Sequence, residues 1–454
     1  MVVNATLDGA SMGWPWALPF IGTLFTIAAG PLLFPQFWHR HYGKLTAGWT
    51  MLTIAMLLHG FGPAKASAAV VEAMLREYLS FIVLLFTLYT VTGGIAIGGV
   101  LRGTPFVNTG VLGLGTLLAS AIGTTGAALL LVRPLIQANA QRAYKTHIVI
   151  FFIILAGNVG GALTPLGDPP LLVGFLQGVD FFWPAKNMWM QTGIVAVLLL
   201  AMFFALDVWF MRKEVPSSEE LRASRIEVHG GINFALIGLA IASIAASALW
   251  NPNVSFDVLG TKVELQNLAR DASLLAIAAL SLRLTPETRK ANNFIWEPIR
   301  EVAILFAGIF IAIIPVLAML QAGRRGAFSW LLSAVTEPDG SPHEAAYFWL
   351  TGLFSAFLDN VPTYLAFFEL AGGQANELMG PLGGTLASIS MGAVYMGGLT
   401  YIGNAPNFMI YSIARERGIK MPNFFGYMLR AAIILLPLFA LLTLLPISPI
   451  LKWE

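Results

Sequence analysis

The sequence contains no cysteine among its 454 residues. The lack of thiols excludes disulfide bonds, thiolate metal sites and catalytic cysteines. Charged residues are also scarce, at 11%, whereas a soluble domain carries about 25%. The formal net charge of +2 is too small to indicate binding to nucleic acid. P-loop and metalloprotease motifs are missing as well, so nothing in the sequence indicates ATP-driven pumping.

Apolar residues dominate the composition instead. They make up 57% of the chain, and the mean hydropathy is +0.74. Runs of about 20 apolar residues, the length that crosses a bilayer as a helix, recur throughout. The sequence therefore predicts an all-α, multi-pass protein in a lipid bilayer of the bacterial inner (plasma) membrane type. The first fifteen residues hold no Lys or Arg, so the first span is expected to stay in the protein rather than serve as a signal peptide.

The apolar runs predict about ten full crossings. They cover residues 16–34, 45–61, 78–101, 146–178, 188–211, 232–250, 268–284, 300–320, 385–414 and 426–448. Two further stretches, 109–137 and 346–372, are interrupted by small or polar residues in SAIGTTGAA and SAFLDNVPT. We expect these two to be re-entrant hairpins, because non-helical backbone at membrane depth is tolerated only inside protein or beside water. Lys and Arg are then about twice as frequent on the cytoplasmic side, and both termini lie outside.

A short helix-breaking phrase occurs twice. TPLGDPP at 164–170 and TYIGNAP at 400–406 share Thr, Gly, an Asp or Asn, and Pro at equal spacing. Each phrase interrupts a predicted span, 146–178 or 385–414, just after a hairpin. This recurrence indicates an internal repeat. The alternative is that Gly and Pro only kink two long helices. A kink alone would not explain why a hairpin precedes each copy.

The repeat divides the chain into two halves. The first covers 1–211, a cytoplasmic linker covers 212–231, and the second covers 232–454. Each half contains five crossings and one hairpin, so the second half would enter the membrane upside down. Inverted repeats with paired broken helices are the architecture of secondary transporters, in which the site lies near the midplane between the repeats.

Hairpin tips and helix breaks supply the candidate site. Broken helix ends expose carbonyl oxygens, which suit Na⁺, and N–H groups, which suit an anion. The first half-site is predicted to contain Thr124, Thr125, Thr164, Gly167 and Asp168, with Asn158 one to two turns before the break. The second is predicted to contain Asp359, Asn360, Thr363, Thr400, Gly403 and Asn404. Aligning the halves sets Asp168 opposite Asn404 and Thr124 opposite Asp359, which gives each half-site one carboxylate.

Two aspartates are the central candidates. A carboxylate at membrane depth is costly, and its default interpretation is functional. Such a group can hold either H⁺ or Na⁺, because burial favours the protonated form and a nearby cation favours the ionised form. The predicted Na⁺ ligands are Asp168, Thr125, Asp359, Asn360 and Asn404. The aspartates could equally cap the N–H groups of a helix start, and the two roles are compatible.

Other charged residues are weaker candidates. Asp207 and Glu369 lie near the ends of apolar segments, where an interfacial position is expected. Glu72 and Glu77 are expected on the solvated face of an outer amphipathic segment. Arg133, in the second arm of the first hairpin, could reach the site or extend to the interface.

The motifs carry a family resemblance. GNVGGALTPLGDPPLL (157–172) and LFSAFLDNVPTYLAF (353–367) resemble the ion transporter superfamily, which includes NhaD-type sodium/proton antiporters and citrate and dicarboxylate transporters. GNAPNFMIYSIA (403–414) is more similar to the citrate transporter members. The Ser-Asn-Thr signature of the dicarboxylate members is absent from both tips. The resemblance implies a homodimer and elevator-type movement. Spans one to three and six to eight would be static, and the hairpins, broken helices and spans five and ten would move.

A Na⁺/H⁺ antiporter is the leading interpretation, with Na⁺ and H⁺ as transported ions and no cofactor. Neither the tips nor the breaks contain Lys or Arg, and Asp168 and Asp359 would repel a multivalent anion. The alternative is a Na⁺-coupled citrate or dicarboxylate symporter, in which Thr125, Asn360 and Thr363 clamp a carboxylate. A small oxyanion such as arsenite and a passive channel remain open. An intramembrane aspartyl protease is a remote alternative, because PLGD lacks one Gly of the Gly-x-Gly-Asp motif; no enzyme is expected.

Overall fold

The computed structural model describes residues 7–99, 101–214, 227–292 and 294–444. Within these ranges the chain is mostly helical, as predicted for an all-α membrane protein. Most of the expected cytoplasmic linker and both ends of the chain, whose side of the membrane was predicted, lie outside the described residues.

The helices up to residue 214 form the first part of the fold. They are α1 Leu18–Leu33, α2 Pro35–Glu72, α3 Leu79–Gly93, α4 Pro105–Ile122, α5 Thr124–Ala138, α6 Thr146–Ala156, α7 Pro169–Leu176 and α8 Trp183–Met211. The regular course of α2 is interrupted at Gly62, whose φ is 79°. Short 3₁₀ helices η1 Gly9–Ser11, η2 Trp14–Ala17 and η4 Val159–Leu163 and a π-helical turn η3 Ala73–Tyr78 complete this part.

The helices after residue 227 form the second part. They are α9 Ile232–Leu249, α10 Leu265–Leu284, α11 Pro286–Ala291, α12 Glu297–Ala312, α13 Ile314–Gln321, α14 Ser329–Ala334, α15 Glu344–Leu358, α16 Asn360–Leu370, α17 Ala375–Met379, α18 Gly383–Met396, α19 Ala405–Glu416 and α20 Phe424–Leu444. The 3₁₀ helices here are η5 Gly323–Arg325 and η6 Gly397–Leu399.

Two small antiparallel sheets accompany the helices. β1 Ala96–Gly98 pairs with β2 Glu227–His229, and β3 Ser255–Val258 pairs with β4 Thr261–Glu264. The first pairing corrects the predicted third span, 78–101, because α3 already ends at Gly93. Two consecutive glycines at this point let the chain leave the helix and enter the β1 ladder.

Each interrupted apolar stretch is a pair of helices joined by one residue. Pro105 occupies the first position of α4, where its missing N–H costs nothing, and the helix ends at Gly123. Gly123 has φ 83°, a conformation that glycine adopts without strain, and α5 begins immediately after it. In the second pair, Asp359 has φ 78° between α15 and α16. The tips are therefore sharp reversals of the backbone.

The two repeated phrases lie in interruptions between helices. η4 and an irregular segment separate α6 from α7, and η6 and a second irregular segment separate α18 from α19. Glycines allow the chain to fold back on itself at these points. A Cβ on Gly167 would overlap the backbone of Gly161, and one on Gly403 would crowd the carbonyl of Gly397. Both segments therefore depend on close contact between backbones.

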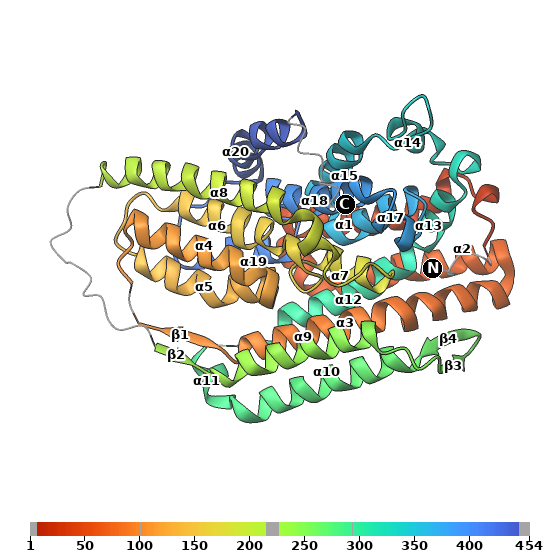
Figure 1. Cartoon of the computed structure of the whole chain (residues 1–454), viewed down its shortest axis with the longest axis horizontal. Coiled ribbons are helices and arrows are strands. Elements are labelled where there is room, and N and C mark those ends of the chain that lie inside the picture. The colour runs from red at the N-terminus through yellow and green to blue at the C-terminus, as the bar shows by residue number, and fades with distance from the viewer. Residues whose placement is uncertain (1–6, 100, 215–226, 293, 445–454) are drawn as a thin grey trace.

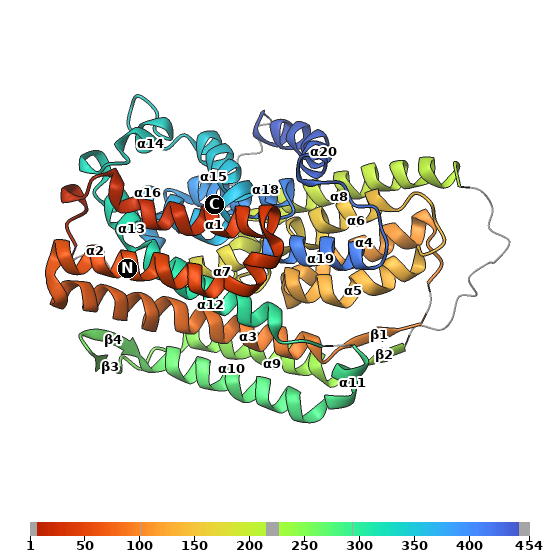
Figure 2. The same ribbon diagram turned by 180° about the vertical axis from the view of Figure 1, so that it is seen from behind.

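Two groups of helices lie side by side in the molecule. An outer group consists of α1, α2, α3, α9, α10 and α12, of which α3, α9 and α10 run along one long side (Figure 1). A core group consists of α4–α8, α15, α16, α18 and α19, and the view from behind shows α4, α5, α6 and α8 gathered at one end (Figure 2). Helices from both predicted halves occur in both groups, so the halves are interleaved in space.

Five helices in the described ranges are individually long and apolar enough to cross a membrane. They are Pro105–Ile122, Thr146–Leu163, Trp183–Met211, Ile232–Leu249 and Phe424–Thr443. The pair α12 and α13, bent by 40°, provides a sixth if counted as one span. Several apolar helices are thus present. The count of ten crossings stays a prediction, and α4, expected to be a hairpin arm, passes the same length and composition test.

A buried ion-pair network ties the open end of the first hairpin to α8. Asp207, with no exposed surface, accepts from Arg142 Nη2 at 2.6 Å and Nη1 at 3.1 Å. His147 Nε2 lies 2.8 Å from the same carboxylate, and Asn108 Nδ2 donates to it at 2.9 Å. The expected interfacial position of Asp207 was wrong, because side chains from three other segments, α4, the loop after α5, and α6, close over it.

Replacing Arg142 with Met should lower the free energy of unfolding by about 3–5 kcal/mol, since Asp207 would stay buried without its bidentate cationic partner. The double variant Arg142→Met/Asp207→Leu should recover much of that loss. Unfolding in detergent, followed by tryptophan fluorescence, measures both. Lys290→Met, at an exposed pair with Glu287, is the matched control and should change little. If the double variant lost the sum of the free energies of unfolding lost by the two single variants, the network would be contradicted.

Candidate functional site

Four helices begin around one carboxylate. Thr124 and Asn360 are the first residues of α5 and α16, and Asp168 and Asn404 immediately precede α7 and α19. Asp168 Oδ1 accepts from Thr124 Oγ1 at 3.0 Å and from Asn404 Nδ2 at 2.9 Å, and Oδ2 accepts from Asn360 Nδ2 at 2.6 Å. All four side chains are buried, and Asp168 has no exposed surface. We call these four residues the Asp168 cluster.

The predicted half-sites therefore meet in a single cluster. Thr124 and Asp168 come from the first predicted half-site, and Asn360 and Asn404 come from the second. The expected separation into two sites, each with its own carboxylate, does not describe the contacts. One carboxylate is shared, and residues from both halves donate to it.

The electrostatics of the cluster are unusual for a buried acid. Each helix start contributes a partial positive charge of about +0.5, and three neutral side chains donate hydrogen bonds to Asp168. No Lys or Arg side chain within the described ranges bonds to it. Arg133, which could have reached the site, instead donates to the backbone carbonyl and side chain of Asn292. Burial opposes the ionised carboxylate, whereas the donors and helix starts favour it.

The register between the hairpins differs from the sequence alignment by one residue. Asp168 and Asn404 are 236 positions apart. The same spacing relates Gly123 to Asp359, the positive-φ tips, and Thr124 to Asn360, the side chains that donate to Asp168. Thr124 thus corresponds to Asn360, and the predicted pairing of Thr124 with Asp359 was wrong. The sequence alignment had paired Ser120 with Ser355, and this pairing is shifted by one residue from the pairing of the two tips.

Asp359 acts as a helix cap at the second tip. Its Oδ1 accepts from the backbone N–H of Val361 at 3.1 Å, and its backbone is held at φ 78° and ψ 143°. A non-glycine residue in this region is strained. Its counterpart in the first tip is Gly123, which has no carboxylate, so the charge of Asp359 has no equivalent there.

The threonines and glycines of the two repeated segments connect each helix break to its hairpin tip. Thr164 Oγ1 donates to the carbonyl of Ser120, and Thr400 Oγ1 donates to that of Ala356 at 2.6 Å. Gly167 accepts from the Thr124 N–H at 2.8 Å, and Gly403 packs closely against the Ala356 carbonyl. These residues position the cluster without touching the Asp168 carboxylate through their side chains.

Asn158 belongs to the helix break next to the cluster but does not contact Asp168. Asn404 Nδ2 also approaches the Gly157 carbonyl at 3.2 Å, and Asn158 Nδ2 donates to Asn407 Oδ1 at 2.7 Å. Asn158 Oδ1 is buried and has no hydrogen-bond partner in the part of the chain that is described. A buried oxygen without a donor is uncommon in proteins and is a potential cation ligand. Asn407, which the sequence analysis missed, is signalled only by the second Asn of GNAPN.

Two predicted ligands are not brought to Asp168. Thr363 Oγ1 turns back to the carbonyl of Asp359 at 2.8 Å. Thr125 is partly exposed, and its hydroxyl forms no hydrogen bond with the cluster in the described ranges. No group of three or more His, Asp or Glu side chains suited to a metal ion is found among the described residues.

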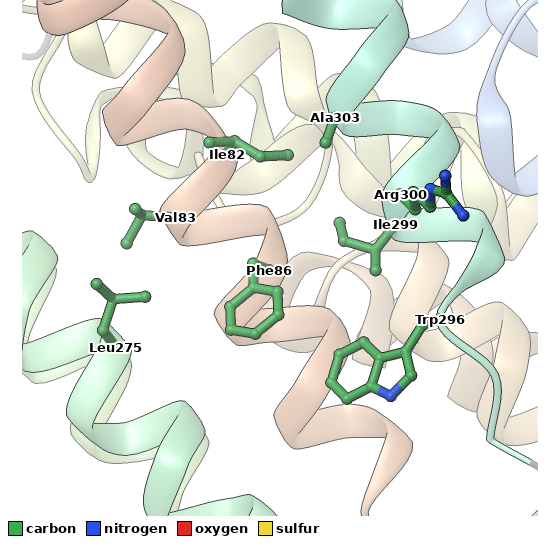
Figure 3. A pocket seen from close by; sticks show the side chains of 8 residues that line it. All are labelled: Ile82, Val83, Phe86, Leu275, Trp296, Ile299, Arg300 and Ala303. Atoms are coloured by element: carbon green, nitrogen blue, oxygen red, sulfur yellow. The ribbon is translucent and has the colours of Figure 1, made fainter. Parts of the chain in front are cut away.

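A surface cavity lies elsewhere on the molecule. It has a volume of about 350 Å³ and is lined by side chains of α3, α10 and α12, together with Trp296 (Figure 3). Its lining is almost wholly apolar, apart from Arg300. Since every lining residue belongs to the outer group or lies just before α12, this cavity is separate from the Asp168 cluster.

Comparison with known proteins identifies the family. A protein family described as "Putative citrate transport" matches residues 9–447. The chain belongs to this family. Uncharacterized transporters of Mycobacterium tuberculosis and Mycobacterium bovis are each 24% identical to it over 348 residues, which cover 73% of this chain and 75% of theirs. The resemblance to a citrate transporter family is confirmed, and the protein is a transporter rather than an enzyme.

Two substitutions at Asp359 separate backbone strain from the cap. Asp359→Ala and Asp359→Gly both lose the hydrogen bond to Val361, but only glycine adopts the tip conformation freely. The glycine variant should therefore be more stable than the alanine variant by about 1–3 kcal/mol. Unfolding midpoints of the two purified variants measure this difference. Equal midpoints would mean that the tip relaxes to another conformation when the aspartate is removed.

Proposed function

We propose that this transporter exchanges Na⁺ for H⁺ at Asp168. One observation carries the proposal: the carboxylate is completely buried, yet all three of its side-chain partners are neutral donors. A buried ionised carboxylate requires compensating charge, of which the four helix starts supply only partial charges spread over several backbone N–H groups. A bound Na⁺ or a proton on the carboxyl group provides that charge, and the two compete for the same oxygens.

The surrounding groups support a cation as the exchanged species. The donors of Thr124, Asn360 and Asn404 are already directed at the protein's own carboxylate. A substrate carboxylate would have to displace it or bind beside a like charge. The unpartnered Oδ1 of Asn158, by contrast, offers a neutral oxygen of the kind that coordinates Na⁺. Asn404 donates to Asp168 and to the carbonyl of Gly157, the residue before Asn158, so the proposed cation would bind Asp168 on this side of the cluster, with Asp359 as a further charge.

The repeated contacts support an inverted repeat as the basis of transport. Thr164 and Thr400 make the same kind of bond from each break to its tip, and both tips reverse at a positive-φ residue. We infer that 1–211 and 232–454 are repeats of opposite orientation, each with five crossings and one hairpin. The core group would move past the outer group in an elevator-type cycle, within a homodimer.

Cation-coupled transport of citrate or another small carboxylate is the second candidate. The family description favours it, and helix N-termini are good binding sites for carboxylates. In this case Na⁺ would first neutralise Asp168, and the substrate would then bind the same helix starts. The two candidates differ in whether Na⁺ alone moves protons.

Replacing Asp168 with Asn should abolish Na⁺-driven proton movement, because the amide cannot bind or release a proton. Purified protein in liposomes containing a trapped pH dye, given an inward NaCl gradient, should make the lumen more alkaline as H⁺ leaves, with choline chloride as the salt control. Asp168→Asn should fall to the rate of empty liposomes. Asp180→Asn, the same change at an exposed position after α7, is the matched control and should keep the wild-type rate. Wild-type exchange in Asp168→Asn would rule out this carboxylate as the exchange site.

Labelled citrate separates the two candidates in the same liposomes. For an antiporter, an inward Na⁺ gradient should drive proton efflux without citrate and should accumulate no label. Citrate uptake that requires Na⁺, together with no proton movement in NaCl alone, would instead establish the symporter. Because both results require Na⁺ at Asp168, the asparagine variant should lose Na⁺-driven proton efflux and the Na⁺ dependence of citrate uptake.

A further inference from the structure

Several charged side chains are buried in or beside the outer group. They are Glu77, Arg270, Asp271 and Arg289. Glu77 was expected on a solvated face, and that expectation was wrong because α12 packs against its π-helical turn. Arg270 bonds to Asp271 at 2.9 Å. Arg289, by contrast, bonds to no acidic side chain in the described ranges, so its positive charge is not paired there.

The contacts of Arg289 are all with neutral groups. Nη1 donates to the carbonyl of Thr90 at 2.5 Å, and Nη2 donates to Ser281 Oγ at 2.5 Å. The guanidinium lies 5.2 Å from the centre of the Phe294 ring. These contacts hold the side chain in place but do not cancel its charge. A buried cation without a counter-ion attracts an anion more strongly than an exposed one, because water screens it less.

Arg289 lines a surface cavity of its own. This cavity, the basic cavity, has a volume of about 560 Å³, and its lining includes Arg289, Lys290, Phe294 and Trp296. Trp296 also lines the apolar cavity between α3, α10 and α12 (Figure 3). The two cavities therefore adjoin at one side chain, and a molecule with a charged end and an apolar end could occupy both.

Trp296 is held between the cavities by two aromatic contacts. Its ring stacks on Phe86 at 5.7 Å with an interplanar angle of 16°, and Phe294 meets it edge-on at 4.8 Å. The ring is still 42% exposed. Arg300, one helical turn further along α12, lies at the edge of the apolar cavity beyond Ile299 (Figure 3). Trp, Lys and Arg side chains gathered in this way are typical of the membrane–water interface.

Positive charge is in excess around the two cavities. Residues 282–300 include the basic side chains Arg283, Arg289, Lys290 and Arg300 and the acidic side chains Glu287 and Glu297. Glu287 pairs with Lys290 at 3.1 Å, and both side chains are exposed, so the pair is weak. The surplus equals the formal net charge of the whole chain, +2. In the predicted order of spans, this segment joins two crossings on the cytoplasmic side.

We propose that the basic and apolar cavities together bind one anionic phospholipid of the surrounding bilayer. Its phosphate would lie beside Lys290 and Trp296, within the field of Arg289 and Arg300, and one acyl chain would follow the apolar cavity past Phe86. Basic pockets between membrane helices are recognised binding sites for anionic headgroups. The indole N–H of Trp296 is a further donor for the phosphate.

Other occupants fit the two cavities less well. A free anion such as phosphate or citrate would leave the apolar cavity empty and exposed. A second copy of the chain, related by a two-fold axis, would set the same surplus of positive charge against itself. A zwitterionic lipid would fill the apolar cavity but would leave the surplus charge uncompensated. The anionic lipid satisfies both cavities.

The lipid would join helices of the outer group to one another. The lining comes from α3, α10, α11 and α12, none of which contributes a side chain to the Asp168 cluster. Binding of the lipid is therefore independent of the proposed exchange at Asp168, and either proposal can fail without the other.

Native mass spectrometry of the purified full-length chain in detergent tests the headgroup. Phosphatidylglycerol should be retained as one tightly bound molecule per chain and should bind better than phosphatidylcholine with the same acyl chains. Lys290→Gln/Arg300→Gln should weaken its binding about 25-fold, since each cation contributes about fivefold. The matched control is Arg40→Gln/Lys44→Gln, which removes the same charges at exposed positions on α2. It should keep the wild-type affinity.

A second substitution tests the apolar cavity without changing any charge. Ala303→Phe would fill the cavity and displace part of the acyl chain. Losing contact with two CH₂ groups should weaken phosphatidylglycerol binding about 15-fold, since each contributes about fourfold. Ala235→Phe, at an exposed position on α9, is the control and should bind like the wild type. Glycerol 3-phosphate, which has the anionic group but no chains, should bind far more weakly, and this comparison decides the point if Ala303→Phe folds poorly.

Four results would overturn the proposal. They are equal binding of the two lipids by the wild type, unchanged binding in Lys290→Gln/Arg300→Gln, glycerol 3-phosphate binding as tightly as the lipid, and a lipid-free dimer that Ala303→Phe dissociates. The third would show a site for free anions, and the fourth would show that a second copy of the chain covers this face.

Discussion

The carboxylate of Asp168 is the interaction on which the centre of this protein depends. Four helices that are far apart in the chain begin around it, and three of them supply a side-chain donor to its two oxygens. A helix start has unpaired N–H groups and a partial positive charge. Bringing four such ends together inside protein would be unfavourable without an anion. The buried acid and the broken helices therefore stabilise each other, and neither would be stable alone in this environment.

Charge in the interior is distributed along two short helices. α7 and α16 point their positive ends at Asp168, and α16 ends just after the buried Glu369. One end of this pair favours an anion, which the chain supplies itself. A second polar centre, at Asp207, is balanced internally by Arg142 and has a structural role.

The sequence predicts much of this architecture because its signals are local. Gly and Pro are present at both helix breaks, and apolar runs predict the helices. The register of the tips was off by one residue because a positive φ at Asp359 is a property of the backbone that the residue type does not reveal. Burial of Glu77 and Asp207 was missed for a different reason. It results from packing between segments that are distant in the chain, which no local pattern encodes.

The pairing of Asp168 with Asn404 means that a single side chain sets the sign of the charge that the centre accepts. Four helix starts and the donors around them form a receptor for a negative charge. With aspartate at position 168 that negative charge is built in, and in the proposed exchange the ligand that completes the centre is positive. An asparagine there, as at Asn404, would leave the same backbone open to a carboxylate from solution. Relatives with this fold could therefore diverge between cation and organic-anion substrates by exchanging one oxygen for one NH₂ group.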